Sequence, residues 1–206
     1  MEKFGECEGN LLSLQIAMRT DMEDFDNKRI GEIILYILGK GELLSQYYVY
    51  KILYFAERKH LARWGCGILP GEFHAWEKGP VPKKIYGGIK HFKEGNHPID
   101  IVLRKVIDRT DRDMGDYLIA LRKPDMDFIS QSEVEALDES YAENVGLTVG
   151  ELMNKSHDSA WTKARAKGND EVMPSIDIAE AEGVSSDLLE YIAESEAVRA
   201  ALEKSA

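Results

Sequence analysis

The sequence predicts an α+β fold that is predominantly α-helical, with a compact helical domain around a central buried helix and a small β-hairpin or strand element. The prediction depends on two observations. Apolar residues recur at helical spacing in several segments, and a short β-like segment precedes a pair of prolines, Pro80 and Pro82. At 206 residues the chain is long enough to bury such a core.

The first two expected helices lie between residues 26 and 64. Isoleucines recur from Ile30 to Ile37 along one face of the first helix, which ends at a pair of nearby glycines. Ser45 is expected to cap the second helix, which stops after Trp64 at a Gly-Cys-Gly sequence. Because the second helix is apolar over more than half its circumference, we expect it to be central and packed on two sides.

A short strand is expected at residues 71–76, GEFHAW, followed by the stiff sequence GPVP at 79–82. Proline fixes its own φ and moves the residue before it out of the helical region, so this stretch is driven extended. Pro82 suits the first turn of a following helix. The pair Gly87-Gly88 inside that helix costs about 2 kcal/mol relative to alanines, so tertiary contacts must hold it.

The second half of the chain is expected to contain a hairpin and further helices. Residues 99–106 and 117–122 flank a turn rich in aspartate, which indicates a β-hairpin. Ser130 and Thr148 each precede a glutamate by three residues, and this capping-box spacing predicts the start of a helix at each site. A last helix is expected to open at Ser185.

The formal net charge of −11 is unevenly distributed along the chain. Residues 45–93 hold nine basic and three acidic side chains, a local charge of +6. Residues 168–206 hold two basic and ten acidic side chains, a local charge of −8. The first of these segments would attract an acidic partner.

These features together predict an organisation in three parts. We expect an N-terminal leader at 1–25, in which residues 10–19 could form a short helix, then a helical domain at 26–166 and an acidic C-terminal segment with a helix at 167–206. No run of about 18 apolar residues exists, so we expect no membrane span. The start of the chain carries acids where a secretory signal carries lysines, and we therefore expect a cytoplasmic protein.

The motifs of common enzymes and metal sites are missing from the sequence. The five histidines form no HxxxH or HExxH pair, and neither cysteine has a partner at CxxC spacing, so no metal site is expected. There is no phosphate-binding P-loop, no GxGxxG after a strand and no GxSxG elbow. We expect no cofactor and no enzyme of a familiar class.

Four segments together resemble a known family. They are YKILYFA at 50–56, GCGIL at 65–69, AWEKGPVP at 75–82 and LMNKSHDSAW at 152–161. Their order and spacing resemble the Panacea domain, the family of SocA-like antitoxins and some phage-associated proteins of bacteria. The pattern spans roughly residues 27–165.

The resemblance implies a mainly helical domain with a small β element that neutralises a cognate protein toxin encoded beside it. In the SocA-like branch the antitoxin is also regarded as a proteolytic adaptor that delivers its toxin to a ClpXP-type protease. The distal H-x-x-x-W of the pattern falls on His157 and Trp161. We therefore expect a protein-binding module of a toxin-antitoxin system and no enzyme, with the toxin's identity and the oligomeric state left open.

The stretch around the two prolines is the expected binding face. A rigid segment loses little entropy when it binds, large aromatic rings are enriched at interface hot spots, and basic charge speeds encounter with an acidic partner. An alternative is that the turn at Trp76 only packs against the central helix, with Tyr54 as a core residue. The candidate partner-binding residues are Lys51, Tyr54, Trp76, Glu77, Lys78, Gly79, Pro80, Val81, Lys83, Lys84 and Tyr86.

Two other functions stay open from the sequence. A nucleic-acid-binding protein would use the basic segment 45–93 with its tyrosines, although an isoelectric point near 5.0 and the acidic C-terminal segment weigh against it. An enzyme of unrecognised class would use His74, Glu77 or His157 as its acid or base.

Overall fold

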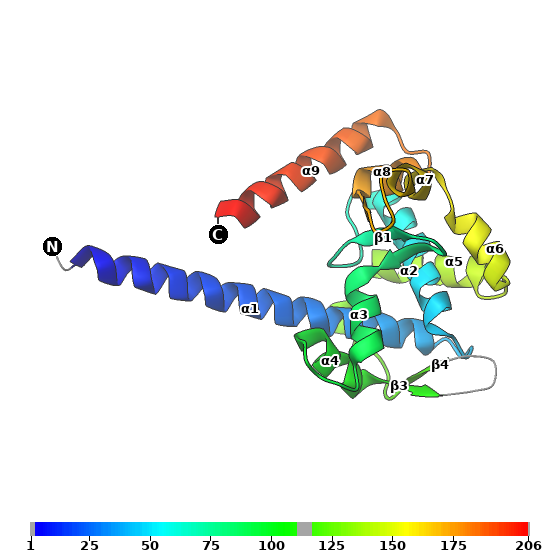
Figure 1. The fold of residues 1–206 in the computed structure, drawn as a ribbon, viewed down its shortest axis with the longest axis horizontal. Coiled ribbons are helices and arrows are strands. Elements are labelled where there is room, and N and C mark those ends of the chain that lie inside the picture. Colours follow the sequence, from blue (N-terminus) through cyan, green and yellow to red (C-terminus); the bar gives the residue numbers. More distant parts are fainter. Residues whose placement is uncertain (1–2, 111–116, 206) are drawn as a thin grey trace.

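The computed structural model describes the backbone of residues 3–110 and 117–205, and the side chains of residues 17–110 and 117–202. The helices are α1 (Lys3–Leu38), α2 (Gln46–Trp64), α3 (Lys83–His91), α4 (Pro98–Val106), α5 (Gln131–Asn144), α6 (Val149–Ser156), α7 (Ser159–Arg165), α8 (Ser175–Glu180) and α9 (Ser186–Ser205), with a 3-10 turn η1 at Met126–Phe128. The strands are β1 (Phe73–Trp76), β2 (Gly79–Pro82), β3 (Ile107–Thr110), β4 (Tyr117–Ala120) and β5 (Val172–Met173). This arrangement confirms the predicted, predominantly helical α+β fold (Figure 1).

Helix α2 is the centre of the molecule, as predicted. Every residue from Val49 to Glu57 is buried, and α5, α6, α8 and β2 all pack against the helix. Gly65 ends the helix in the left-handed conformation, φ 67°, and its N–H donates to the carbonyl of Leu61. Ser45 does occupy the N-cap position, but its hydroxyl makes no capping hydrogen bond. Burial on all sides therefore accounts for the stability of this helix better than capping does.

Helix α1 is continuous, whereas the sequence suggested a short helix at residues 10–19 separate from a second one. Its last turns are buried, with Ile30, Ile33, Ile34 and Ile37 fully inaccessible. The side chains at 17–25 are exposed, and in Figure 1 this part of α1 extends beyond the body of the protein. The exposed side chains at 17–25 need no apolar stripe, so helical periodicity did not connect the two segments.

Strands β2, β1 and β5 form an antiparallel three-stranded sheet in that order. Phe73 pairs with Pro82 and Trp76 pairs with Gly79, so a two-residue turn at 77–78 connects β1 to β2. Prolines suit β2 because it is an edge strand. The strand at 71–76 and the extended GPVP segment are thereby confirmed, while β5, which pairs Met173 with Phe73, was not predicted.

The predicted β-hairpin is partly wrong. Residues 99–106 lie in helix α4, where Ile99, Leu103 and Val106 are buried at helical spacing. The N-terminus of α4 has a capping box between His97 and Asp100. Strand β3 begins only at residue 107, and it does pair antiparallel with β4. The aspartate-rich turn expected between the strands falls mainly at 111–116, outside the described residues.

The glycine pair in α3 has a packing role at one of its two positions. A Cβ added at Gly88 would lie 2.8 Å from Leu103 Cδ1 and 2.9 Å from Ile99 Cγ1, so α3 and α4 approach closely only with glycine there. A Cβ added at Gly87 would meet nothing within 4 Å. The tertiary contacts expected for this helix are therefore made at Gly88.

The other capping predictions are confirmed. Ser130 caps α5 and Thr148 caps α6, each in a reciprocal capping box with the glutamate three residues later. The last helix, α9, begins at residue 186 and buries Ile192, whereas Val198 and Leu202 are exposed. Helix α8, which lies just before it, was not predicted. Within the described part of the chain, no helix combines the length and the apolar character needed to cross a membrane.

Candidate partner-binding site

The site is built where α2, the β1–β2 hairpin and the start of α7 meet. Lys51 of α2 is fully buried, and its Nζ donates to the carbonyl oxygen of Pro80 over 3.0 Å. Gly79 has φ 97°, and a Cβ there would collide with Lys51 Nζ and with Ser156 Oγ. The hairpin therefore reaches α2 through a glycine that both its φ and the available space require.

Burial changes the acid-base behaviour of Lys51. Removal of the ammonium from water lowers its pKa to about 7, and the negative charge of Asp158 only partly opposes this shift. The Nζ atom also lies 5.1 Å from the ring centroid of Tyr47, a cation-π distance. Lys51 is thus not the surface lysine that a simple charged binding face would use.

Asp158 joins the central helix to α7. Its Oδ2 accepts hydrogen bonds from Tyr54 Oη at 2.6 Å and from Arg58 Nη1 at 2.9 Å. Its Oδ1 accepts from the backbone N–H of Trp161 at 3.0 Å, which caps α7. Burial raises the pKa of Tyr54 well above its usual value, and the neighbouring carboxylate raises it further. Tyr54 is a core residue held by a hydrogen bond.

The distal H-x-x-x-W of the sequence holds the end of β1. The rings of His157 and Trp161 stack with centroids 3.7 Å apart and an interplanar angle of 4°. Trp161 Nε1 donates to the carbonyl oxygen of Trp76 over 2.8 Å. Partial burial lowers the pKa of His157, and the nearby charge of Lys51 lowers it further. The motif therefore has a positioning role next to the hairpin.

Trp76 is half-buried at the surface end of this junction. Its ring meets the ring of Tyr86 edge to face at 4.7 Å, and its Nε1 donates to Asp170 Oδ1 at 2.6 Å. Lys83 Nζ donates to the other oxygen of Asp170, also at 2.6 Å. These hydrogen bonds, the one from Lys83 first, lower the pKa of Asp170 to about 2. Trp76 and Lys83 are thus tied to a loop that the sequence did not connect with them.

A pocket of about 480 Å³ opens between α2, the hairpin and the start of α3. Of the residues predicted for partner binding, Lys51, Trp76, Glu77, Lys78, Pro80, Val81 and Tyr86 line it. Gly79 and Tyr54 are buried and do not line it, and Lys83 and Lys84 lie outside it. Gln46, Tyr47 and Tyr50 also line the pocket and were not predicted, although the two tyrosines follow the same stripe of α2 as Tyr54.

A family model describes this region of the chain. The model of the SocA-like antitoxins, the Panacea domain, matches residues 49–162. The chain belongs to this family. Searches of curated proteins and of solved structures gave no match. The matched residues include α2 from Val49 onward, the hairpin and Trp161, so the Panacea domain contains most of the wall of the pocket.

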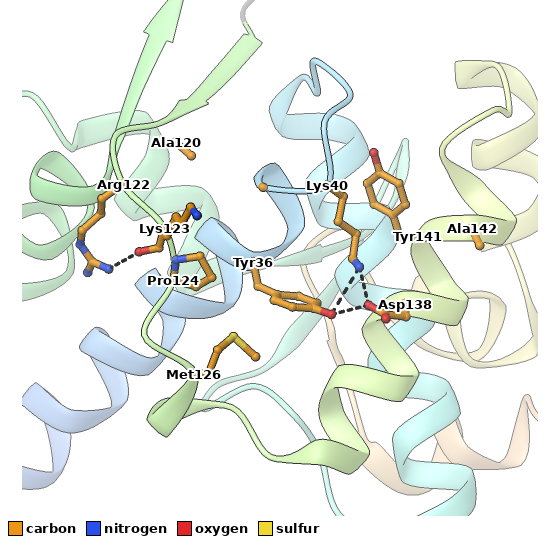
Figure 2. A pocket seen from close by; sticks show the side chains of 11 residues that line it. Tyr36, Lys40, Ala120, Arg122, Lys123, Pro124, Met126, Asp138, Tyr141 and Ala142 are labelled. Atoms are coloured by element: carbon orange, nitrogen blue, oxygen red, sulfur yellow. Dashed lines mark hydrogen bonds and ion pairs between the residues drawn. The ribbon is translucent and has the colours of Figure 1, made fainter.

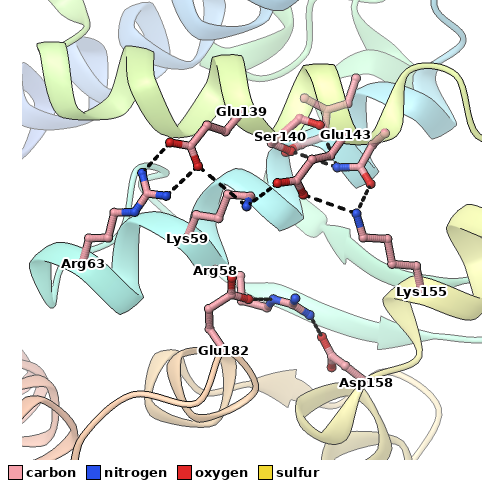
Figure 3. A network of polar contacts seen from close by, with 11 residues as sticks. Arg58, Lys59, Arg63, Glu139, Ser140, Glu143, Lys155, Asp158 and Glu182 are labelled. Carbon is pink, nitrogen blue, oxygen red and sulfur yellow. Dashed lines mark hydrogen bonds and ion pairs between the residues drawn. The ribbon is translucent and has the colours of Figure 1, made fainter.

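Part of the basic charge of the Panacea domain is used internally. Figure 3 shows Arg58 between Asp158 and Glu182, and Lys59 and Arg63 directed at α5. Lys59 Nζ lies 2.7 Å from a carboxylate oxygen of Glu143, and Arg63 makes two hydrogen bonds to Glu139. The local charge of +6 at residues 45–93 therefore leaves less free positive charge at the surface than the sequence suggested. Lys78 and Lys84 make no ion pair among the described residues.

A second pocket, of about 860 Å³, lies outside the matched hairpin region, between the end of α1, the segment after β4 and α5 (Figure 2). Lys40 Nζ lies 2.5 Å from Asp138 Oδ1, and Tyr36 Oη donates to the same carboxylate at 2.6 Å. Arg122 pairs with Glu32. Lys40 and Arg122 are thus each paired with a carboxylate, and we assign this pocket no function. No group of three or more metal-ligating His, Cys, Asp or Glu side chains occurs among the described residues.

Proposed function

We propose that this Panacea-domain protein is an antitoxin that neutralises a cognate protein toxin by direct binding. The proposed binding face comprises Trp76, the turn at 77–78 and Tyr86, together with the pocket between them. One observation carries the proposal: the family match at 49–162 includes Tyr50 and Lys51 of α2 and the whole hairpin, which line this pocket. A binding role, without catalysis, is what membership of an antitoxin family favours.

The rigidity of the hairpin supports a role in binding. Trp161 and Lys51 hold the carbonyl groups of Trp76 and Pro80, and Tyr47 Oη donates to the carbonyl of Lys78 at 3.2 Å. A backbone fixed at three points before binding loses little conformational entropy in the complex. The half-buried Trp76 and Tyr86 provide the large rings that dominate interface energies.

The charge around the pocket supports an acidic partner surface. Lys78 is exposed at the turn, and neither it nor Lys84 is paired with an acid among the described side chains. Unpaired lysines accelerate the encounter with an acidic surface and contribute less to the final affinity. Lys83 adds less than expected because it is paired with Asp170.

Co-expression tests the proposal. Each open reading frame adjacent to the gene is induced with and without this protein, and growth and co-purification are followed. We expect one neighbour to arrest growth and this protein to restore it in a stable complex. Trp76→Ala and the double variant Lys78→Glu/Lys84→Glu should abolish rescue, whereas Lys123→Glu, an exposed charge reversal at the second pocket, should not. Rescue by both hairpin variants at unchanged affinity would place the toxin elsewhere.

We further propose that the protein acts in the cytoplasm and delivers its toxin to a ClpXP-type protease. The resemblance to the SocA-like branch suggests this role, and the part of α1 that extends beyond the body offers a segment that a protease can reach while the pocket holds the toxin (Figure 1). The toxin's half-life should shorten when the antitoxin and the protease are both present. An equal half-life in cells without the protease would leave steric neutralisation as the mechanism.

A further inference from the structure

Two buried polar groups line the pocket without the partners that such groups need. The hydroxyl of Tyr50 is inaccessible to solvent and has no hydrogen-bond partner, and the residue as a whole is 4% exposed. Lys51 is fully buried, and the carbonyl of Pro80 accepts one hydrogen bond from its Nζ. An ammonium group has three donors, so Lys51 has donors to spare. Both side chains contribute to the wall of the pocket of about 480 Å³.

The neighbouring acids do not neutralise Lys51. Asp158 is engaged by Tyr54, Arg58 and the N-terminus of α7. Glu77 lines the pocket but is exposed at the turn. A buried lysine normally has an anionic partner, because a charge without one is costly in the interior. The charge pattern therefore favours an anionic oxygen group from outside the chain.

The other walls of the pocket are aromatic. Tyr47 lies beside the Lys51 ammonium, and Trp76 and Tyr86 meet edge to face at 4.7 Å. Tyr50 and Tyr86 lie 6.1 Å apart between ring centroids. Such walls suit an apolar stem, and two donors, one ammonium and one hydroxyl, suit a group with two acceptor oxygens.

We propose that this pocket receives a carboxylate of the toxin, with Lys51 and Tyr50 donating to its oxygens and the rings of Tyr47, Trp76 and Tyr86 enclosing its stem. The inference rests on the proposed antitoxin function. It adds the chemistry of the contact and a residue, Tyr50, that the sequence did not single out.

The acid-base properties of the site give the proposal a pH signature. The pKa of Lys51 is about 7 in the free protein, and a bound carboxylate would raise it, so binding takes up a proton. Affinity should be full below about pH 7 and fall as the pH rises above it. The other charged or titratable groups that face Lys51 are Asp158 and His157 at the start of α7, Tyr47 and Tyr54 on α2, and Glu77 and Lys78 on the turn. The pKa of His157 is lowered from its usual value of 6.5, so protonation of this histidine does not account for a fall in affinity above pH 7.

The first experiment uses benzoate as the probe, with uncharged benzamide as its control, on the full chain by calorimetry. We expect benzoate to bind roughly 20-fold more tightly at pH 6.5 than at pH 8.5, the ratio of protonated Lys51 at the two values. Benzamide should show no such dependence. Absence of benzoate binding at pH 6.5, or equal affinity at both pH values, would overturn the carboxylate site.

Variants assign the effect to the two donors. Lys51→Met should abolish the pH dependence, and Tyr50→Phe, which removes only a hydroxyl, should weaken benzoate about tenfold while the pH dependence remains. Lys123→Met, an exposed change at the second pocket, should preserve both. Because Tyr50→Phe keeps the aromatic ring, it should fold normally, and it tests the site even if the Lys51 variant misfolds. Unchanged benzoate affinity in Tyr50→Phe contradicts the role of Tyr50.

The toxin complex identifies the source of the carboxylate. We expect one Asp→Asn, Glu→Gln or C-terminal amide change in the toxin to remove the pH dependence of its binding. Benzoate could show the expected pH dependence while the affinity for the toxin changes neither with pH nor in Lys51→Met. The pocket would then bind a small free acid, and the proposal would fail although the antitoxin function stands. If no neighbouring frame encodes a toxin, the antitoxin function fails and the benzoate result alone defines the pocket.

Discussion

The indole nitrogen of Trp161 donates to the backbone carbonyl of Trp76 over 2.8 Å, across 85 positions of sequence. The same tryptophan stacks on His157, and the next residue, Asp158, accepts a hydrogen bond from the hydroxyl of Tyr54. One short segment at the start of α7 therefore holds both the end of β1 and the middle of α2. The stability of this junction and the geometry of the proposed binding face should change together.

Trp161→Phe should test this connection. The ring can still stack on His157, but the carbonyl of Trp76 loses its donor, so we expect a loss of about 1 kcal/mol in the free energy of unfolding. Urea denaturation measures the loss, and toxin affinity should fall with it. Trp64→Phe is the matched control because Trp64 is 55% exposed. Equal stability in the two variants would mean that the hydrogen bond contributes nothing.

Asp158→Asn should destabilise the protein by about 2 kcal/mol. The change weakens charge-assisted hydrogen bonds to Tyr54 and Arg58, and Arg58 keeps Glu182 as a second partner, which limits the loss. Chemical denaturation of this variant is compared with that of Asp127→Asn, an exposed change in the η1 turn. A stability equal to that of the Asp127 variant contradicts the role given to this carboxylate.

Two glycine substitutions should change the free energy of unfolding in opposite directions. Gly79→Ala places a Cβ against Lys51 Nζ and Ser156 Oγ at φ 97°, so we expect a loss of about 2 kcal/mol or more. Gly87→Ala in α3 adds a methyl group to open space and should stabilise by about 1 kcal/mol. Thermal unfolding of both variants provides the comparison. A stable Gly79→Ala protein would show that the hairpin can move away from α2.

Glu57 should make stability depend on pH. Burial raises its pKa from 4.5 to about 7, although the backbone N–H groups of Leu69 and Ile68 donate to its carboxylate and oppose the shift. The folded protein therefore holds a proton that the unfolded chain has lost, so stability falls as the pH rises from about 4.5 to about 7. The wild type should lose about 3 kcal/mol relative to Glu57→Gln across this range.

Urea titrations at pH 4 and pH 8 measure that difference. Glu135→Gln, an exposed change on α5, serves as the control and should follow the wild type at both pH values. Parallel pH profiles for the wild type and Glu57→Gln would show that Glu57 ionises normally in the folded protein.

Local signals made most of the fold predictable. The apolar stripe of α2, the capping boxes at Ser130 and Thr148 and the prolines of β2 each specify their own element. The predictions failed where tertiary contacts determine the secondary structure. Residues 99–106 contain β-branched residues typical of strands, but they bury a helical face against α3 and α1. Strand β5 is two residues long and exists only because β1 lies beside it.

The candidate site was predictable in position and less so in its chemistry. The aromatic and proline-rich motif correctly indicated a structured turn, and seven of the eleven candidate residues line one pocket. Lys51 was expected to contribute surface charge, yet it is fully buried beside Gly79 and Pro80. Asp170 was not anticipated because it reaches Trp76 from a loop 94 positions away. A side chain's protonation depends on such distant neighbours, which spacing along the sequence does not reveal.

The three-point attachment of the hairpin also has a kinetic consequence. Because Trp161, Lys51 and Tyr47 fix its carbonyl groups, we expect the hairpin to bind without first rearranging its backbone. Association should therefore proceed in a single step, at a rate set by diffusion and by the unpaired lysines Lys78 and Lys84. Toxins of different affinity should then differ chiefly in how slowly they dissociate.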